Sequence, residues 1–255
     1  MRVMSVSEQP TLVIRTDQDH IAVITLDSPA NRNALSAALV TQLTAHITQA
    51  GTDTDLHGIL LRSSGRVFCA GVDLREAMTV DMVAAGRGIV ALQRSIAAAE
   101  VPVVCRVDGP VRAGGLGIVA SADLVLAARE ADFALTEVRL GLAAAIISVP
   151  VLGRLTPRAA ADWFLTGRTV SAQEAVRAGL VTRVEPAGGD LDAAVDSVLT
   201  DLRAGERQGL VEAKRMLAAG LVADLDARGD DLAELSGRLF HSEVAQGHFA
   251  RFLAR

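Results

Sequence analysis

The sequence predicts an α/β fold that ends in a helical segment. Runs rich in β-branched residues alternate with stretches of helical periodicity as far as about residue 184, and only helical patterns follow from residue 191. Such alternation is typical of stacked ββα or βαβ units. We therefore expect two domains, an α/β core over residues 1–190 and a helical region over residues 191–255.

The first elements are predicted to be a hairpin followed by a helix. "TLVIRT" and "IAVITL" are rich in β-branched residues and flank "DQDH", which predicts paired strands over 11–16 and 21–26. Ser36 can then cap a helix that extends to about residue 49. The apolar face of this helix repeats every four residues, at Leu35, Leu39, Leu43 and Ile47.

The alternation continues through the middle of the chain. We expect strands at 58–64, 101–107 and 123–128, a helix at 80–98, a short helix from Gly114, and short helices across 143–166. "SAQE" at 171–174 is a capping box that opens another helix, and Gly179 is placed to end it. The C-terminal region is predicted to hold four helices, at 191–204, 207–219, 230–240 and 242–253.

Composition argues against several classes of function. The net charge is −5, aromatic residues make up 3% of the chain, and no basic block occurs, so nucleic acid is not an expected partner. No apolar run reaches the roughly 18 to 20 residues that span a bilayer, and the first ten residues lack a signal-peptide pattern. We therefore expect a cytoplasmic protein without a membrane partner. The two cysteines and five scattered histidines match no metal-site spacing, so no metal is expected.

Two strand-to-loop junctions carry small residues, and their chemistry has three interpretations. "GLGIVA" matches a dinucleotide fingerprint, but seven residues separate Val107 from Gly115, whereas that fingerprint needs its first glycine directly after the strand. The glycines could also serve only close packing of a short helix. A second junction, Ala70-Gly71, favours a third interpretation. The N–H groups of both junctions can converge on one oxygen and form an oxyanion hole.

At these residues the chain resembles the crotonase superfamily, the enoyl-CoA hydratases and isomerases. The resemblance runs from about residue 11 to the C-terminus and rests on "NRNALS", "FCAGVDL", "VDGPVRAGGLGIVASADLVLAA", "FALTEVRLGL" and "TGRTVSAQEAVRAGLV". It implies a crotonase-type spiral of stacked ββα units with a C-terminal helical segment. It also implies an acyl-CoA thioester substrate, no separate cofactor because CoA is part of that substrate, and a homotrimer or a hexamer of two trimers.

The resemblance also implies roles for individual residues. Ala70 and Gly114 match the two oxyanion donors, which act through backbone N–H groups, and Glu137 falls on one of two catalytic glutamates. The other glutamate falls on Gly117, which is a departure from the pattern. The remaining residues implied to contact the substrate are Gly71, Val72 and Asp73 at the thioester and Arg32 at the CoA phosphates.

A single glutamate leaves the reaction open. Hydration of an enoyl-CoA in fatty-acid or branched-acid degradation is the first expectation, with Glu137 both activating water and returning the proton. The alternatives are isomerisation, in which one carboxylate moves a proton from C2 to C4, and non-catalytic acyl-CoA binding because of Gly117. The segment 75–95 follows the first junction, and its apolar residues favour an apolar acyl chain.

Overall fold

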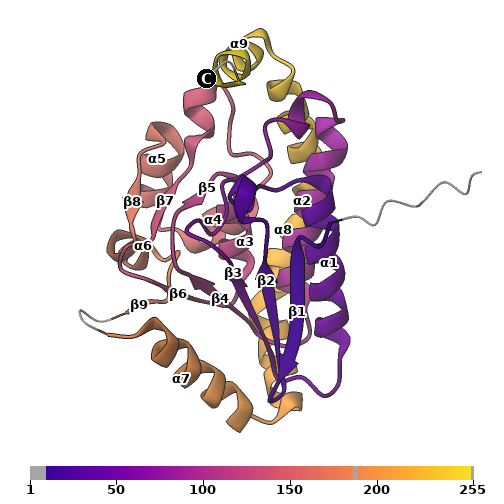
Figure 1. Ribbon diagram of the computed structural model, residues 1–255, viewed down its shortest axis with the longest axis vertical. Coiled ribbons are helices and arrows are strands. Elements are labelled where there is room, and N and C mark those ends of the chain that lie inside the picture. The colour runs from indigo at the N-terminus through magenta and orange to yellow at the C-terminus, as the bar shows by residue number, and fades with distance from the viewer. Residues whose placement is uncertain (1–9, 186–188, 254–255) are drawn as a thin grey trace, which may run out of the picture.

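The protein is described by a computed structural model that covers residues 10–185 and 189–253. The first nine residues, on which the expectation about a signal peptide depends, lie outside the described ranges. The centre of the protein is a six-stranded sheet in the order β1-β2-β3-β4-β6-β9 (Figure 1). In this sheet β1 is antiparallel to β2, and the other pairs of strands are parallel. Its strands are β1 (Val13–Gln18), β2 (Ile21–Leu26), β3 (Gly58–Ser63), β4 (Val103–Val107), β6 (Leu124–Ala127) and β9 (Arg183–Val184).

A smaller sheet and the helices complete the α/β arrangement that the sequence predicts. The small sheet has the order β5-β7-β8, from β5 (Val111–Arg112), β7 (Asp132–Ala134) and β8 (Val170–Ser171). The helices are α1 (Ala37–Thr52), α2 (Met82–Ala98), α3 (Gly114–Ser121), α4 (Ser148–Arg154), α5 (Pro157–Thr166), α6 (Ala172–Ala178), α7 (Leu191–Ala204), α8 (Arg207–Phe240) and α9 (Glu243–Leu253). The described residues also form the 3₁₀ turns η1 (Pro29–Asn31), η2 (Glu76–Met78) and η3 (Thr136–Leu140).

Local signals predicted the ends of several elements. The Ser36 side chain accepts a hydrogen bond from the Leu39 N–H at the start of α1, and the Ser171 side chain does the same for the Glu174 N–H in α6. Gly179 ends α6 with φ +98°. The hairpin is tighter than expected, because Asp19 and His20 both have positive φ and form a two-residue turn, so β1 runs two residues further than predicted.

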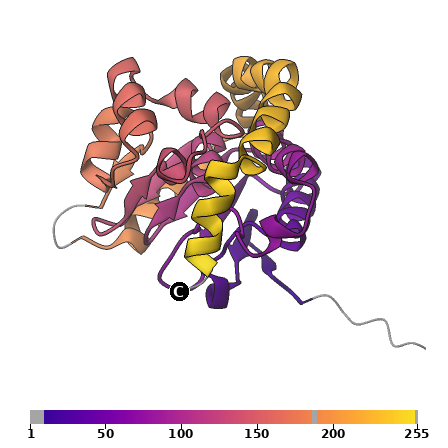
Figure 2. The same ribbon diagram turned by 90° about the horizontal axis from the view of Figure 1, so that it is seen from above.

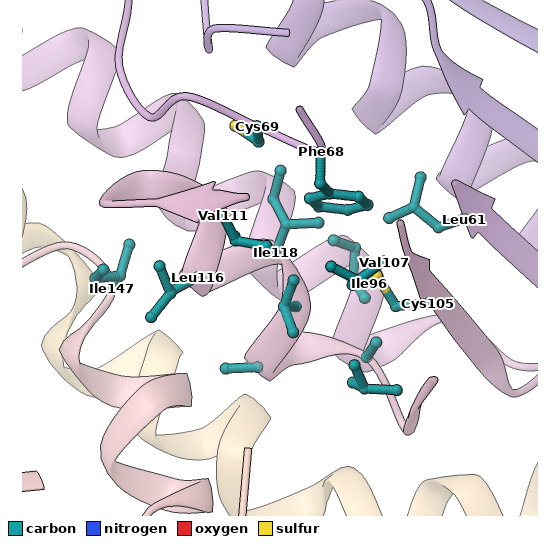
Figure 3. Packing of buried hydrophobic residues seen from close by; sticks show 14 of the residues in the cluster. Leu61, Phe68, Cys69, Ile96, Cys105, Val107, Val111, Leu116, Ile118 and Ile147 are labelled. Atoms are coloured by element: carbon teal, nitrogen blue, oxygen red, sulfur yellow. The ribbon is translucent and has the colours of Figure 1, made fainter. Parts of the chain in front are cut away.

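The main sheet is covered on both faces. On one face, Leu61 and Cys105 pack with Phe68 and Ile96 in the large core (Figure 3). On the other face, α7 covers a second apolar cluster formed by side chains of β2, β3, β4 and β6 (Figure 1). The boundary near residue 190 remains a prediction. No helix in residues 10–185 and 189–253 has both the length and the apolar character needed to cross a bilayer.

The prediction of separate helices at 207–219 and 230–240 was wrong, because α8 is one helix of 34 residues. Glycines on both helices allow α8 to approach α2, and the two helices lie side by side (Figure 2). A methyl group on Gly229 would lie 2.6 Å from Val90 Cγ1, and one on Gly86 would lie 3.3 Å from Ala233 Cβ. Close packing therefore offsets the low helix propensity of glycine.

A buried ion pair ties α8 to the sheet. Lys214 is 2% exposed, and its ammonium group pairs with Asp123, which also accepts a hydrogen bond from the Val103 N–H at 2.7 Å. A second bond runs from Lys214 Nζ to the Ile96 carbonyl at 3.1 Å. Desolvation lowers the pKa of Lys214, and the Asp123 carboxylate opposes that shift.

Replacing Lys214 with methionine is expected to lower the free energy of unfolding by about 3–5 kcal/mol, because the Asp123 carboxylate would stay buried without its cation. Urea denaturation measures this loss. Arg94→Met is the matched control, since it breaks an exposed α2–α8 pair with Asp226 and should cost less than about 1 kcal/mol. Equal losses in unfolding free energy in the two variants would show that the buried pair stabilises the fold no more than the exposed pair does.

Candidate active site

A cavity of about 570 Å³ opens where the loops after β2 and β3, the start of α3, the turn η3 and the end of α8 meet. Of the residues predicted for the site, those that line it are Arg32, Ala70, Val72, Asp73, Gly114 and Glu137. Gly71 is buried and has φ +91°, and a Cβ on it would lie 2.9 Å from the Ala113 Cβ. The chain thus brings the two junctions and the glutamate to one cavity, although they are far apart in sequence.

The first junction offers a different donor from the one expected. The Ala70 N–H donates to the Arg32 carbonyl at 3.1 Å and so is already occupied. The Leu35 N–H donates to the Gly71 carbonyl at 2.7 Å, and the Leu35 carbonyl accepts a hydrogen bond from the Asp73 N–H at 3.3 Å. These two hydrogen bonds form a parallel bridge between Leu35 and Val72, and in such a bridge the N–H of Val72 points away from Leu35. Val72, two residues beyond Ala70, therefore replaces it as the candidate donor.

The second junction places an uncapped helix end beside Val72. Gly114 is the first residue of α3, and no side chain caps that helix. A Cβ on Gly114 would lie 3.9 Å from the Val72 nitrogen, so the two backbones are neighbours. The first-turn N–H groups of a helix lack intrahelical acceptors and carry the positive end of its dipole. The pair can therefore stabilise negative charge on one oxygen.

Backbone strain orients the Gly114 N–H. Ala113 has φ 46° and ψ −122°, a conformation that costs a residue with a side chain on the order of 1–3 kcal/mol. Its own N–H donates to the Ala134 carbonyl at 3.0 Å, which holds the peptide against the small sheet. The ψ angle of Ala113 sets the direction of the N–H that follows it, so the strained conformation of Ala113 determines where the Gly114 N–H points.

Glu137 supplies the carboxylate. It lies in η3, and its Oε2 is buried without a hydrogen-bond partner among the described residues. Desolvation raises the pKa of this carboxyl from 4.5 to about 7, and a backbone hydrogen bond opposes the shift. A carboxyl with a pKa near neutrality can both accept and return a proton at physiological pH. The surroundings of Glu137 therefore suit a general acid–base group.

Space beside Gly117 is already filled. Gly117 lies in the first turn of α3, and a Cβ there would come within 2.6 Å of Ile147 Cγ2 and 2.8 Å of Gln93 Nε2. Gln93 is fully buried, and neither its amide nitrogen nor its amide oxygen has a partner among the described residues. No sequence motif marked Gln93 or Ile147. The packing shows that position 117 has no room for a longer side chain in this arrangement.

Three further residues near the cavity are Asp73, Cys69 and Arg32. Asp73 Oδ1 accepts from the Arg75 and Glu76 N–H groups at 3.0 and 3.3 Å, so this carboxylate caps the turn η2 at the rim of the cavity. Cys69 is fully buried, and desolvation raises the pKa of its thiol to about 12, which keeps it protonated. Arg32 lines the mouth with a left-handed backbone, and its carbonyl holds Ala70.

Comparisons with known proteins agree on one family. A family model described as "Enoyl-CoA hydratase/isomerase" matches residues 16–253. "Probable enoyl-CoA hydratase echA8" of Mycobacterium bovis is 31% identical over 240 residues, which cover 92% of this chain and 90% of that protein. "Mevalonyl-coenzyme A hydratase SIDH" of Beauveria bassiana is 34% identical over 206 residues, covering 74% and 73%. The crystal structure of an enoyl-CoA hydratase from Mycobacterium avium superposes with a TM-score of 0.88 at 40% identity, covering 96% of this chain and 97% of that one.

Proposed function

Because the chain belongs to the enoyl-CoA hydratase/isomerase family, we propose that it adds water to a trans-2-enoyl-CoA thioester. The observation that supports this most is the meeting of two backbone donors and one desolvated carboxyl in a single cavity. In this proposal Val72 and Gly114 donate to the thioester oxygen, and Glu137 moves the protons. Arg32 and Arg75, at the mouth, would meet the phosphates of CoA.

The oxyanion donors act on the charge that develops during addition. As oxygen bonds to C3, electron density moves through C2 to the thioester oxygen and forms an enolate. Two N–H groups held by the backbone stabilise this charge without reorganising, and one such donor is typically worth about 10²- to 10³-fold in rate. The strain at Ala113 then contributes to catalysis, because it turns the Gly114 N–H.

Glu137 completes the proton balance. Its carboxylate takes one proton from water as the hydroxyl bonds to C3, and the resulting carboxylic acid returns that proton to C2 of the enolate. One group suffices when its pKa lies near the working pH, as the pKa of about 7 allows. No second carboxylate is required by this balance.

Isomerisation is the second candidate, and the packing around Gly117 favours it. A single carboxyl that removes a proton from C2 of a 3-enoyl-CoA and delivers it to C4 moves the double bond without water. The filled space beside Gly117 leaves Glu137 alone for such a transfer. A non-catalytic acyl-CoA binder would use the same cavity but would need no proton transfer by Glu137.

A second cavity adjoins the first and suits an apolar part of the acyl chain. It measures about 300 Å³, lies between α1 and α2, and shares Val72 and Asp73 with the first. Its walls are mostly apolar, and Val80, Met82 and Ile89 come from the segment 75–95, whose apolar residues favour an apolar acyl chain.

A homotrimer, or a hexamer of two trimers, remains part of the proposal. Phe240 of α8 is already buried within the chain, where it stacks on Phe249. Exposed Met216 and Leu217 of α8 are better candidates for subunit contacts. Sedimentation velocity that showed only monomers at micromolar concentration would contradict the assembly.

Turnover of matched thioesters tests the reaction. Purified protein is offered trans-2-hexenoyl-CoA and cis-3-hexenoyl-CoA, and the products are separated by chromatography. We expect 3-hydroxyhexanoyl-CoA from the first substrate. Formation of the 2-enoyl product from the second, without hydration, would replace hydration with isomerisation, and no conversion of either would favour the binder.

A further inference from the structure

One polar side chain at the cavity has no assigned task. Ser236 of α8 is 4% exposed, and it lines the 570 Å³ cavity one helical turn before Phe240. The same cavity is also lined by the apolar side chains of Leu142 and Ile146. When a bound molecule displaces water from the cavity, this hydroxyl needs another hydrogen-bond partner.

Other helical hydroxyls in the protein find that partner within their own helix. Thr41 donates to the Ala37 carbonyl at 2.8 Å, and Ser121 donates to the Gly117 carbonyl at 2.7 Å. Among the described residues, no hydrogen bond joins the Ser236 hydroxyl to its own helix or to another segment. Its donor and its acceptor are therefore both available to a molecule in the cavity.

We infer that Ser236 recognises a hydrogen-bonding oxygen on the acyl group of the substrate, beyond the carbons that react. The chemical class is an acyl-CoA whose chain carries a hydroxyl or a carbonyl group. This inference rests on the proposed function, because it places a CoA thioester in the cavity. A site built to bond such an oxygen discriminates against the plain chain, since binding that chain would leave the Ser236 hydroxyl buried and unpaired.

Equilibrium binding of saturated thioesters tests the inference without turnover. Dissociation constants are measured by calorimetry for hexanoyl-CoA, 5-hydroxyhexanoyl-CoA, 6-hydroxyhexanoyl-CoA and 5-oxohexanoyl-CoA. For the wild type, we expect at least one oxygenated chain to bind roughly 3- to 10-fold more tightly than hexanoyl-CoA. In Ser236→Ala that ratio should fall to near one.

Ser148→Ala is the matched control, because the Ser148 hydroxyl is buried without a partner among the described residues and Ser148 does not line either cavity. It should keep the wild-type ratio. A ratio near one in the wild type for every oxygenated chain, or a ratio that survives in Ser236→Ala, would overturn the inference alone. Failure of all four thioesters to bind would overturn the proposed function together with it.

Discussion

Replacing Glu137 with glutamine is expected to lower kcat for the preferred enoyl-CoA by roughly 10²- to 10⁴-fold, the usual contribution of one general acid–base group. Glutamine keeps the shape of the side chain but cannot take a proton from water or from C2. The fold should survive, because Glu137 Oε2 has no partner to lose among the described residues. Steady-state turnover beside a thermal melt measures both effects.

The control is Glu130→Gln, which neutralises an exposed carboxylate outside the cavity and should retain wild-type turnover. Wild-type kcat/KM for hydration should rise with pH through about 7, because the free enzyme needs the ionised carboxyl as its base. If Glu137→Gln kept wild-type kcat, Glu137 would have no catalytic role, whichever reaction the protein performs.

The same variant should also change the pH dependence of stability. The pKa of Glu137 is raised from 4.5 to about 7 in the folded protein, so between these values the unfolded carboxyl ionises while the folded one stays protonated. The wild type therefore loses stability as pH rises through this window, and the loss persists above it. Glu137→Gln should remove that loss, so its advantage in unfolding free energy over the wild type should be larger at pH 8 than at pH 5.

Replacing Gly117 with glutamate is expected to destabilise the protein by about 3 kcal/mol or more and to leave hydration no faster. The new Cβ would overlap Ile147 Cγ2 and Gln93 Nε2, and the carboxylate would enter a fully buried site. Overpacking and an unpaired buried charge each carry costs of this order. Chemical denaturation and turnover of the same substrate measure the two effects.

Two further variants separate crowding from charge. Gly220→Glu places the same side chain on an exposed part of α8, where nothing lies within 4 Å of the new Cβ, and should cost little. Gly117→Glu combined with Ile147→Ala should lose less stability than the sum of the single changes, because the second change makes room for the first. Wild-type stability and faster hydration in Gly117→Glu alone would show that the space is free, and the interpretation of Gly117 would fail.

Features that depend on neighbouring residues in the chain could be predicted from the sequence. The cap at Ser36, the end of α6 at Gly179 and the hairpin before residue 26 arise from short-range backbone chemistry, and all three were found. The α/β class followed from the periodicity, and the family from ordered motifs. Glu137 could be assigned to the site because it lies in "FALTEVRLGL", one of the motifs that carry the family resemblance.

Properties that depend on distant segments could not be predicted in this way. The choice of Val72 over Ala70 depends on which N–H the chain near Arg32 and Leu35 already occupies. Gly117 gave no sign that Ile147 and Gln93 fill the adjacent space.

The amino-acid order was thus sufficient to identify the elements, the family and the glutamate, because caps, periodicity and motifs are local. Only packing in three dimensions decided which backbone donor is free, how much room lies beside Gly117, and that Ser236 reaches the cavity. Ser236 does so because α8 continues through Gly229 against α2, and no sequence signal marks a contact that depends on two helices meeting. Hydrogen-bond occupancy and steric exclusion are properties of contacts, and contacts exist only once the chain has folded.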